Sequence, residues 1–251
     1  MRACGLVSVS FRDHTPEEIA AAAHACGLSC IEWGSDVHAP AADAARLAAV
    51  AAISAENHIR ISSYGSYFKI GRDAPSDFPP YIRAAKALGT RIIRLWCGTK
   101  GYAAYTADEL ARLFADCREI ERIAAAADVI VCMECHGGTV TDCAEGTAAL
   151  MDAVGSAHFR RSWQPNQFRT VEENLRCAAL CAPYTEVIHV FNWQGREKYP
   201  LAAAADVWRR YLACFPEKIP LLLEFMPDGR IESLAAEAAA LRALAEGETK
   251  E

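Results

Sequence analysis

Eight short runs of β-branched and aromatic residues alternate along the chain with eight alanine-rich segments, and this alternation limits the possible folds more than any other feature. Such an alternation is typical of repeated βα units around a parallel sheet. The predicted strands are residues 4–10, 29–34, 59–64, 91–97, 129–136, 159–164, 186–191 and 220–225. The predicted helices are residues 16–26, 42–54, 78–88, 107–126, 147–154, 171–181, 201–214 and 231–245.

Eight βα units of roughly equal length favour a closed barrel over an open doubly wound sheet. No G-x-G-x-x-G motif follows the first predicted strand, as an open dinucleotide-binding sheet would require. The chain has 251 residues, and one such barrel typically takes about 250. No linker rich in proline, glycine or serine divides it. We therefore predict a single (β/α)8 TIM barrel domain over residues 1–251.

Charge and composition exclude several classes of partner. The net charge is −6 at pH 7, and the chain lacks the basic patch of a nucleic-acid binder, so we expect no nucleic-acid partner. No run approaches the roughly 20 apolar residues that span a bilayer, so we expect no membrane partner. Eleven scattered cysteines predict reduced, buried thiols in a cytoplasmic protein and not a disulfide framework. The expected partner is a small molecule, and the sequence leaves a homo-oligomer open.

Polar residues interrupt three late apolar strands near their carboxyl ends, where the catalytic groups of such barrels lie. Glu134 lies in VIVCME, His189 in EVIHVF and Glu224 in LLLEF. Because whole βα units separate these residues, a closed barrel can bring all three to one mouth. A buried carboxylate is costly unless it is paired or bound to a cation. The alternatives are a structural ion pair for the carboxylates and a hydrogen-bonded core position for His189.

Gln164, in RRSWQPN at the end of the sixth predicted strand, is a candidate fourth ligand. Its amide oxygen can ligate a cation without adding charge, or its amide can hydrogen-bond a substrate instead. Oxygen and imidazole donors together suit Mn²⁺, with Co²⁺, Mg²⁺ or Zn²⁺ as alternatives. We therefore predict a divalent metal ion held by Glu134, His189 and Glu224, with Gln164 as the candidate fourth ligand.

The fifth predicted strand also carries Cys132 and Cys135, in the sequence VCMEC. Strand alternation places these two side chains on opposite faces, whereas a redox dithiol needs both sulfurs together. No second cysteine pair lies at the spacing of a zinc finger. We therefore predict that both cysteines are structural thiols.

The order and spacing of these residues resemble the xylose isomerase-like barrel superfamily, often described as sugar phosphate isomerases and epimerases. The resemblance rests on GLSCIEWG (27–34), MECH with Glu134, IHV with His189 and LLLEF with Glu224, and it spans essentially the whole chain. It implies that Glu134 and Glu224 both hold a metal and move protons. This chain departs from the ketose epimerases of the superfamily by having Gln164 where they have an aspartate.

The leading functional prediction is a metal-dependent sugar or polyol isomerase or epimerase. It would transfer a proton at a carbon next to a carbonyl, through an enediolate. The alternative is a lyase that removes water from a keto-polyol, because the superfamily contains dehydratases of keto-inositols and of dehydroshikimate. A catalytically inactive, polyol-binding barrel is a third alternative, and Gln164 is its basis. The apurinic endonucleases of the superfamily fit poorly, since Tyr64 and Trp96 stand where they have histidines and the chain is acidic.

Several residues at or just beyond the strand ends are candidates for substrate contact, because they lie on the rim that carries the active site in such barrels. Two further residues, Glu32 and Arg94, are candidates for orienting or lining roles. Core packing is the alternative for Trp96, and an ordinary polar loop position is the alternative for the residues that follow strands. The predicted substrate-binding residues are His38, Tyr64, Trp96, His136, Asn192 and Arg196.

Overall fold

The computed structural model describes residues 2–247, in which eight parallel strands close into a barrel. Residue 1 and residues 248–251 of the predicted domain lie outside the described residues. The barrel strands are β1 (Cys4–Val7), β2 (Cys30–Gly34), β3 (Arg60–Ile70), β4 (Ile92–Cys97), β5 (Ile130–Glu134), β6 (Phe159–Trp163), β7 (Thr185–Val190) and β10 (Leu221–Leu223). Their order around the barrel is β1-β10-β7-β6-β5-β4-β3-β2. The predicted (β/α)8 TIM barrel is confirmed.

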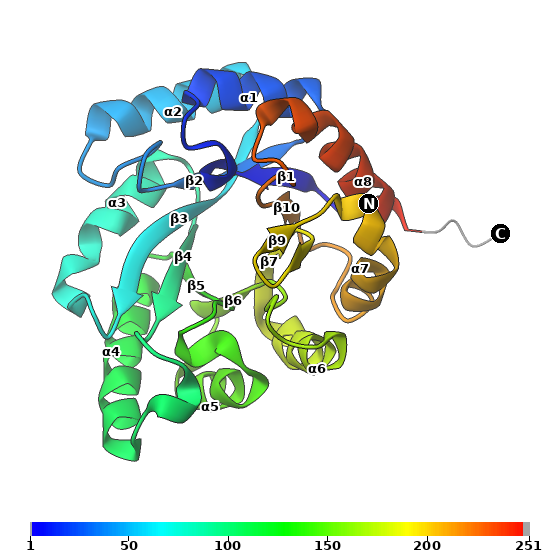
Figure 1. Ribbon diagram of the computed structural model, residues 1–251. Helices are drawn as coiled ribbons and strands as arrows, with labels where there is room; N and C mark the ends of the chain where they lie inside the picture. Colours follow the sequence, from blue (N-terminus) through cyan, green and yellow to red (C-terminus); the bar gives the residue numbers. More distant parts are fainter. Residues whose placement is uncertain (1, 248–251) are drawn as a thin grey trace.

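Eight helices surround the barrel and cover its outer face (Figure 1). They are α1 (Pro16–Ala25), α2 (Ala44–Glu56), α3 (Pro79–Ala87), α4 (Ala107–Ala126), α5 (Ala144–Val154), α6 (Val171–Cys181), α7 (Ala205–Leu212) and α8 (Leu234–Glu246). Three of them begin with a capping box, in which a threonine side chain and a glutamate three residues later each satisfy a free backbone N–H. The boxes pair Thr15 with Glu18, Thr106 with Glu109, and Thr170 with Glu173.

Several boundaries differ from the predictions for local reasons. The first strand ends at Val7 and not at residue 10, because residues 8–11 form a 3-10 turn. The second helix begins at Ala44, two residues later than predicted, because the Asp43 side chain caps it by accepting from the backbone N–H of Arg46. The last two predicted helices each open with a 3-10 segment, Leu201–Ala204 and Ile231–Ser233.

Two strand features escaped prediction. Strand β3 continues to Ile70, six residues beyond its predicted end, and its register with β4 shifts between Gly65 and Lys69. The loop after β7 contains a small antiparallel hairpin of β8 (Trp193–Gln194) and β9 (Glu197–Lys198). Both features lie at the carboxyl-terminal end of the barrel, so they shape its mouth and not its body.

The helix layer packs against the barrel through large buried side chains. Trp163 of β6 contacts Trp208 and Tyr211 of α7 and the following Phe215, with ring centroids 5.0 to 6.1 Å apart. Tilted and edge-to-face contacts of this kind bury much apolar area and fix the orientation of a helix.

No helix in residues 2–247 combines the length and the hydropathy that crossing a membrane requires. Because the helices cover the outer face of the barrel, we expect a functional site at the carboxyl-terminal rim of its strands.

Candidate active site

Glu134, His189 and Glu224 meet at the carboxyl-terminal mouth of the barrel. Glu134 ends β5, His189 lies in β7, and Glu224 directly follows β10. One ligand atom of each side chain lies within 4.8 Å of the ligand atoms of the other two. The backbone N–H of Glu224 donates to the carbonyl of Val190 at 2.9 Å, which extends the strand pairing to this residue. All three side chains are buried, so the barrel brings the predicted core of the site together.

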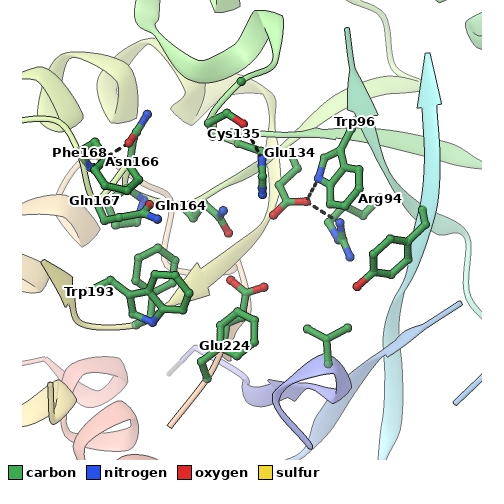
Figure 2. A pocket seen from close by; sticks show the side chains of 18 of the residues that line it. Arg94, Trp96, Glu134, Cys135, Gln164, Asn166, Gln167, Phe168, Trp193 and Glu224 are labelled. Carbon is green, nitrogen blue, oxygen red and sulfur yellow. Dashed lines mark hydrogen bonds and ion pairs between the residues drawn. The ribbon is translucent and has the colours of Figure 1, made fainter. Parts of the chain in front are cut away.

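Two N–H donors from β4 hold the Glu134 carboxylate on one side. Arg94 Nη1 and Trp96 Nε1 both donate to Glu134 Oε2, each at 2.5 Å. These donors are two residues apart in one strand, so they share a face. In Figure 2 both donors lie on one side of the carboxylate, and Gln164 and Glu224 lie on the other. Because both bonds end on Oε2, Oε1 is free of these donors and can ligate a cation.

Arg94 also binds Glu32 of β2, so one guanidinium joins two buried carboxylates. Its Nε donates to Glu32 Oε1 at 2.8 Å. Burial acts to raise the pKa of Glu32, but the charges of Arg94 and His189 hold this pKa well below its usual range. The ion pair of Glu32 and Arg94 needs a glycine at position 65 of β3. A Cβ there would lie 2.7 Å from Glu32 Oε1 and 2.9 Å from Arg94 Nη2. Glu32 therefore has the orienting position that the sequence left open.

His189 is oriented by Glu32 and presents its other nitrogen to the ligand set. Nε2 lies 3.3 Å from Glu32 Oε2, whereas Nδ1 lies 3.2 Å from Gln164 Oε1 and 3.7 Å from Glu224 Oε2. When Nε2–H donates to a carboxylate, the lone pair of Nδ1 is left for a metal, an arrangement common at metal sites. Without a metal, Nδ1 faces two acceptor oxygens. Burial lowers the pKa of His189, but Glu32 and Glu224 raise it to about 9.

The donor set and its charge fit a divalent cation. Glu134, Gln164, His189 and Glu224 would hold it through the oxygen and imidazole nitrogen atoms that suit Mn²⁺. Three buried carboxylates, including that of Glu32, face one guanidinium, so a neutral His189 leaves two negative charges uncompensated. Buried charge of this kind is strongly unfavourable unless a cation balances it. Gln164 adds an oxygen without charge, whereas an aspartate there would overbalance a divalent ion.

Binding of Mn²⁺ is expected to release about one proton at pH 7 and to strengthen as the pH rises toward 9. The reason is that His189, with its pKa raised to about 9, is protonated in the metal-free protein and must be neutral to ligate. One released proton makes the affinity rise about tenfold per pH unit below that pKa. Calorimetric titration in two buffers of different ionisation enthalpy measures the released protons. An affinity for Mn²⁺ that does not change between pH 6.5 and 8.5 would contradict this assignment.

Three of the four candidate ligands, Glu134, Gln164 and Glu224, line a cavity of about 480 Å³ at the barrel mouth. A cavity of this size accommodates a small molecule, and small-molecule sites typically combine apolar walls with a few polar groups. Here the polar groups include the carboxylates of Glu134 and Glu224 and the amide of Gln164. Aromatic side chains supply much of the wall: Tyr67, Trp96, Phe168, Phe191, Trp193 and Phe225.

Two predicted substrate residues, Trp96 and His136, line this cavity. Their rings are tilted against each other with centroids 5.1 Å apart. The indole N–H of Trp96 is used by Glu134, so its ring face and not its N–H is available to a ligand. His136 is exposed, and its Nδ1 lies 2.8 Å from the carbonyl of Gly137.

The structure corrects the predictions for His38 and Tyr64, which do not line the cavity. His38 is buried, with Nδ1 3.1 Å from the hydroxyl of Ser8 and Nε2 3.2 Å from the carbonyl of His14. The hydroxyl of Tyr64 donates to the carbonyl of Ala39 at 2.7 Å, and the ring is fully buried. Both side chains secure loops against the barrel, because their polar atoms are bound within the protein.

The predictions for Asn192 and Arg196 are corrected as well. The Asn192 amide donates to the carbonyl of Pro200 at 2.9 Å and braces the base of the hairpin loop. Arg196 lies exposed in the turn between β8 and β9 and does not line the cavity. The hairpin contributes Trp193 to the cavity wall instead.

The chain also matches known proteins. The sequence profile of a family described as "Xylose isomerase-like TIM barrel" matches residues 20–190, which is more than half of the chain. A comparison with curated proteins finds no match.

Solved structures with the same fold include three of particular relevance. The probable 3-DHS dehydratase AsbF of Bacillus anthracis superposes with a TM-score of 0.79 at 17% identity, over 96% of this chain and 99% of AsbF. An L-ribulose 3-epimerase gives a TM-score of 0.71 at 17% identity, over 98% and 94%. A xylose isomerase-like TIM barrel protein of Mycobacterium smegmatis, in complex with magnesium, gives 0.73 at 13% identity, over 98% and 97%. At these identities the likeness shows the fold, and one fold carries several chemistries.

The closed barrel topology is the fold that the matched sequence profile describes. The same span of the chain carries Glu32, Glu134 and His189, and its fold places their side chains at one mouth. The chain belongs to the xylose isomerase-like TIM barrel family.

Proposed function

We propose that this protein is a metal-dependent enzyme that moves a proton at a carbon next to a carbonyl of a small sugar or polyol, as an isomerase or epimerase does. The observation that carries the proposal is the pair of buried carboxylates, Glu134 and Glu224, with oxygens within 4.8 Å of each other and of His189 at the floor of a cavity. Paired carboxylates beside a Lewis acid suit proton transfer from carbon. The family assignment is consistent with this chemistry but does not select it.

Glu224 is the residue to which we assign the proton transfer. Burial raises the pKa of Glu224, so its affinity for a proton is closer to what a general base needs near neutral pH. It lines the cavity, and its Oε2 lies 3.7 Å from His189 Nδ1. Glu134 differs, because Arg94 and Trp96 occupy its Oε2. Glu134 therefore orients the substrate and is the second acid/base group.

A divalent cation held by Glu134, Gln164, His189 and Glu224 would supply Lewis acidity that polarises the substrate carbonyl. The chain's own residues bind and orient the rest of the molecule. Aromatic faces such as those of Trp96 and Trp193 suit the apolar face of a sugar ring. The burial of the carboxylates keeps competing water away from the proton in transit.

The charges of the cavity wall favour an unphosphorylated substrate. Two arginines line the cavity, and both are already ion-paired. Arg94 is bound by Glu32 and Glu134, and the Nε of Arg12 donates to Asp36 at 2.6 Å. Arg196, a predicted substrate-binding residue, does not line the cavity. We therefore propose a neutral ketose, aldose or cyclic keto-polyol as the substrate.

Elimination of water is the second candidate, and one observation favours it. An epimerase returns the proton on the opposite face, so two groups must exchange protons, whereas an elimination needs one base next to the carbonyl. Glu134 accepts two N–H bonds on Oε2 and Glu224 accepts neither, so the two carboxylates are unequal. This inequality suits a one-base reaction such as the dehydration of a keto-polyol.

The test is incubation of the Mn²⁺-loaded protein in deuterated water with neutral ketoses, their phosphate esters and cyclic keto-polyols. Mass spectrometry then separates the two candidates. Isomerisation or epimerisation gives a product that carries solvent deuterium with no other change in mass, and elimination gives a product lighter by one water. We expect the neutral compounds to react faster than their phosphate esters. If neither deuterium uptake nor loss of water is faster than with metal alone, across all three groups, the enzyme proposal is contradicted.

A further inference from the structure

A second group of metal-type ligands lies next to the candidate active site, and one of its members, Cys135, also lines the active-site cavity. Cys135 directly follows β5, and Cys177 and Cys181 lie one helical turn apart on α6, so the latter two share a helix face. The Sγ atoms of the three residues lie within 4.8 Å of one another, and all three side chains are buried. Cys181 Sγ is 4.0 Å from Cys135 Sγ and 3.8 Å from Cys177 Sγ. We call these three residues the thiol cluster.

A buried arginine without a carboxylate partner lies against the thiol cluster. Arg161 of β6 is fully buried, and its Nη2 lies 2.6 Å from Cys135 Sγ and 3.4 Å from the hydroxyl of Thr147. Within residues 2–247 no Asp or Glu forms an ion pair with it, and its Nε and Nη1 have no hydrogen-bond partner. A buried charge without a counter-ion is strongly destabilising. The sulfur atoms of the thiol cluster are thus the negative partners available to Arg161.

The spacing of the sulfurs matches a metal site. A Zn–S bond of about 2.3 Å implies a sulfur–sulfur separation of about 3.8 Å in a tetrahedral centre and about 4.0 Å in a trigonal one. The two measured separations, 3.8 and 4.0 Å, lie at these values. A disulfide needs about 2.05 Å, so none of these pairs is bonded. The described cysteines are all free.

A small cavity gives access to the thiol cluster. It has a volume of about 60 Å³ and is lined by Cys135 and Cys177, together with polar residues of the loop before α5 and of α6. A volume of roughly 10–15 Å³ holds a water molecule, so this cavity can supply a fourth ligand from solvent. It also provides the entry path that a metal ion needs.

We propose that Cys135, Cys177 and Cys181 bind one soft divalent cation, with Zn²⁺ as the expected ion. Their site adjoins the candidate active site but shares none of its predicted metal ligands. On binding, the three thiols lose their protons to solvent and become thiolates. Three thiolates and a divalent cation leave one negative charge, which the guanidinium of Arg161 neutralises. A monovalent ion such as Cu⁺ would leave one further negative charge buried, so the charge balance favours Zn²⁺. Because Cys135 directly follows Glu134 in the chain, an ion bound to Cys135 would restrict the movement of the carboxyl end of β5.

Titration of the reduced, chelator-treated full-length protein with Co²⁺ tests this proposal. Thiolate ligands give Co²⁺ an intense charge-transfer absorption in the near ultraviolet, whereas oxygen and imidazole ligands do not, so the readout is independent of the candidate active site. We expect the wild type to reach the absorbance of one thiolate-bound Co²⁺ per chain, and to lose this absorbance on addition of excess Zn²⁺. Cys177→Ser and Cys181→Ser should lose it. Cys117→Ser, which removes another buried helix thiol, should keep it.

The proposal is overturned if the wild type shows no charge-transfer absorption, or if Cys177→Ser and Cys181→Ser retain it. If these variants do not fold, alkylation mapping of the wild type decides instead. Zn²⁺ should slow the alkylation of Cys135, Cys177 and Cys181 but not that of the less buried Cys26 and Cys214. Equal alkylation rates with and without Zn²⁺ would equally overturn it.

Discussion

Glu224→Gln should slow proton exchange at the substrate carbon by about 10³-fold, the size typical of losing a general base. The amide keeps an oxygen near His189 Nδ1, as Gln164 already does at 3.2 Å, so a cation can still be held. What the variant loses is the group whose pKa is raised by burial and which accepts the proton. The assay is deuterium uptake from solvent by the substrate, with Mn²⁺ occupancy measured in the same samples.

Glu237→Gln is the matched control for that variant. Glu237 is also a buried glutamate, but it lies on α8 and accepts from the backbone N–H of Leu201 at 2.9 Å, away from the cavity. Its amide oxygen can still accept that bond, so exchange should stay at the wild-type rate. Exchange by Glu224→Gln within a few-fold of wild type, at full Mn²⁺ occupancy, would remove Glu224 from the mechanism.

Arg94→Met is expected to lower the free energy of unfolding of the metal-free protein by about 3–5 kcal/mol. The variant leaves the carboxylates of Glu32 and Glu134 buried without their common cation. Burial opposes the charge of Arg94, yet Glu134 and Glu32 raise its pKa above the usual value, so the guanidinium stays charged at all accessible pH values. Urea denaturation followed by circular dichroism measures the loss.

Arg91→Met provides the comparison for Arg94. Arg91 lies three residues earlier, is exposed, and pairs with Asp128 on the surface. Surface ion pairs contribute about 0–1 kcal/mol, so this variant should be nearly as stable as the wild type. Adding Glu32→Gln to Arg94→Met should recover part of the lost stability, since one buried charge is removed. Equal losses for Arg94→Met and Arg91→Met would show that the buried network does not depend on the guanidinium.

The barrel and the centre of its site could be predicted because they follow from short-range patterns. The βα alternation predicts the strands, and period two within a strand predicts which face Glu134 takes. The positions of Glu134, His189 and Glu224 near strand ends then predict one mouth, and the structure places them there. None of these steps needs the exact register between strands.

The network around that centre depends on register, which the sequence does not reveal. Arg94 and Glu32 are 62 residues apart, and His189 and Glu32 are 157 apart. Their contacts require the register shift between β2 and β3 at Glu32 and the glycine at Gly65 that makes room. A polar residue at a buried strand end indicates that its side chain needs a hydrogen-bond or ion-pair partner, but the sequence does not identify that partner.

Loop residues were the least predictable part of the site. His38 and Asn192 follow barrel strands, as predicted, yet their loops turn the side chains toward backbone carbonyls and not toward the cavity. The thiol cluster was hidden for a related reason, because Cys135 and Cys181 are 46 residues apart and meet only through the packing of α6. Spacing rules for zinc sites describe local motifs and do not detect such a meeting.

The anomalous scattering of a crystal grown with Mn²⁺ shows whether Glu134, Gln164, His189 and Glu224 hold one cation. Four strand-end residues should share one cation, and each of them lies in or beside the cavity floor. We expect one manganese peak bounded by Glu134, Gln164, His189 Nδ1 and Glu224, with Glu32 still bound to His189 Nε2. A fully loaded crystal with manganese elsewhere, or with no peak between these four side chains, would contradict the account.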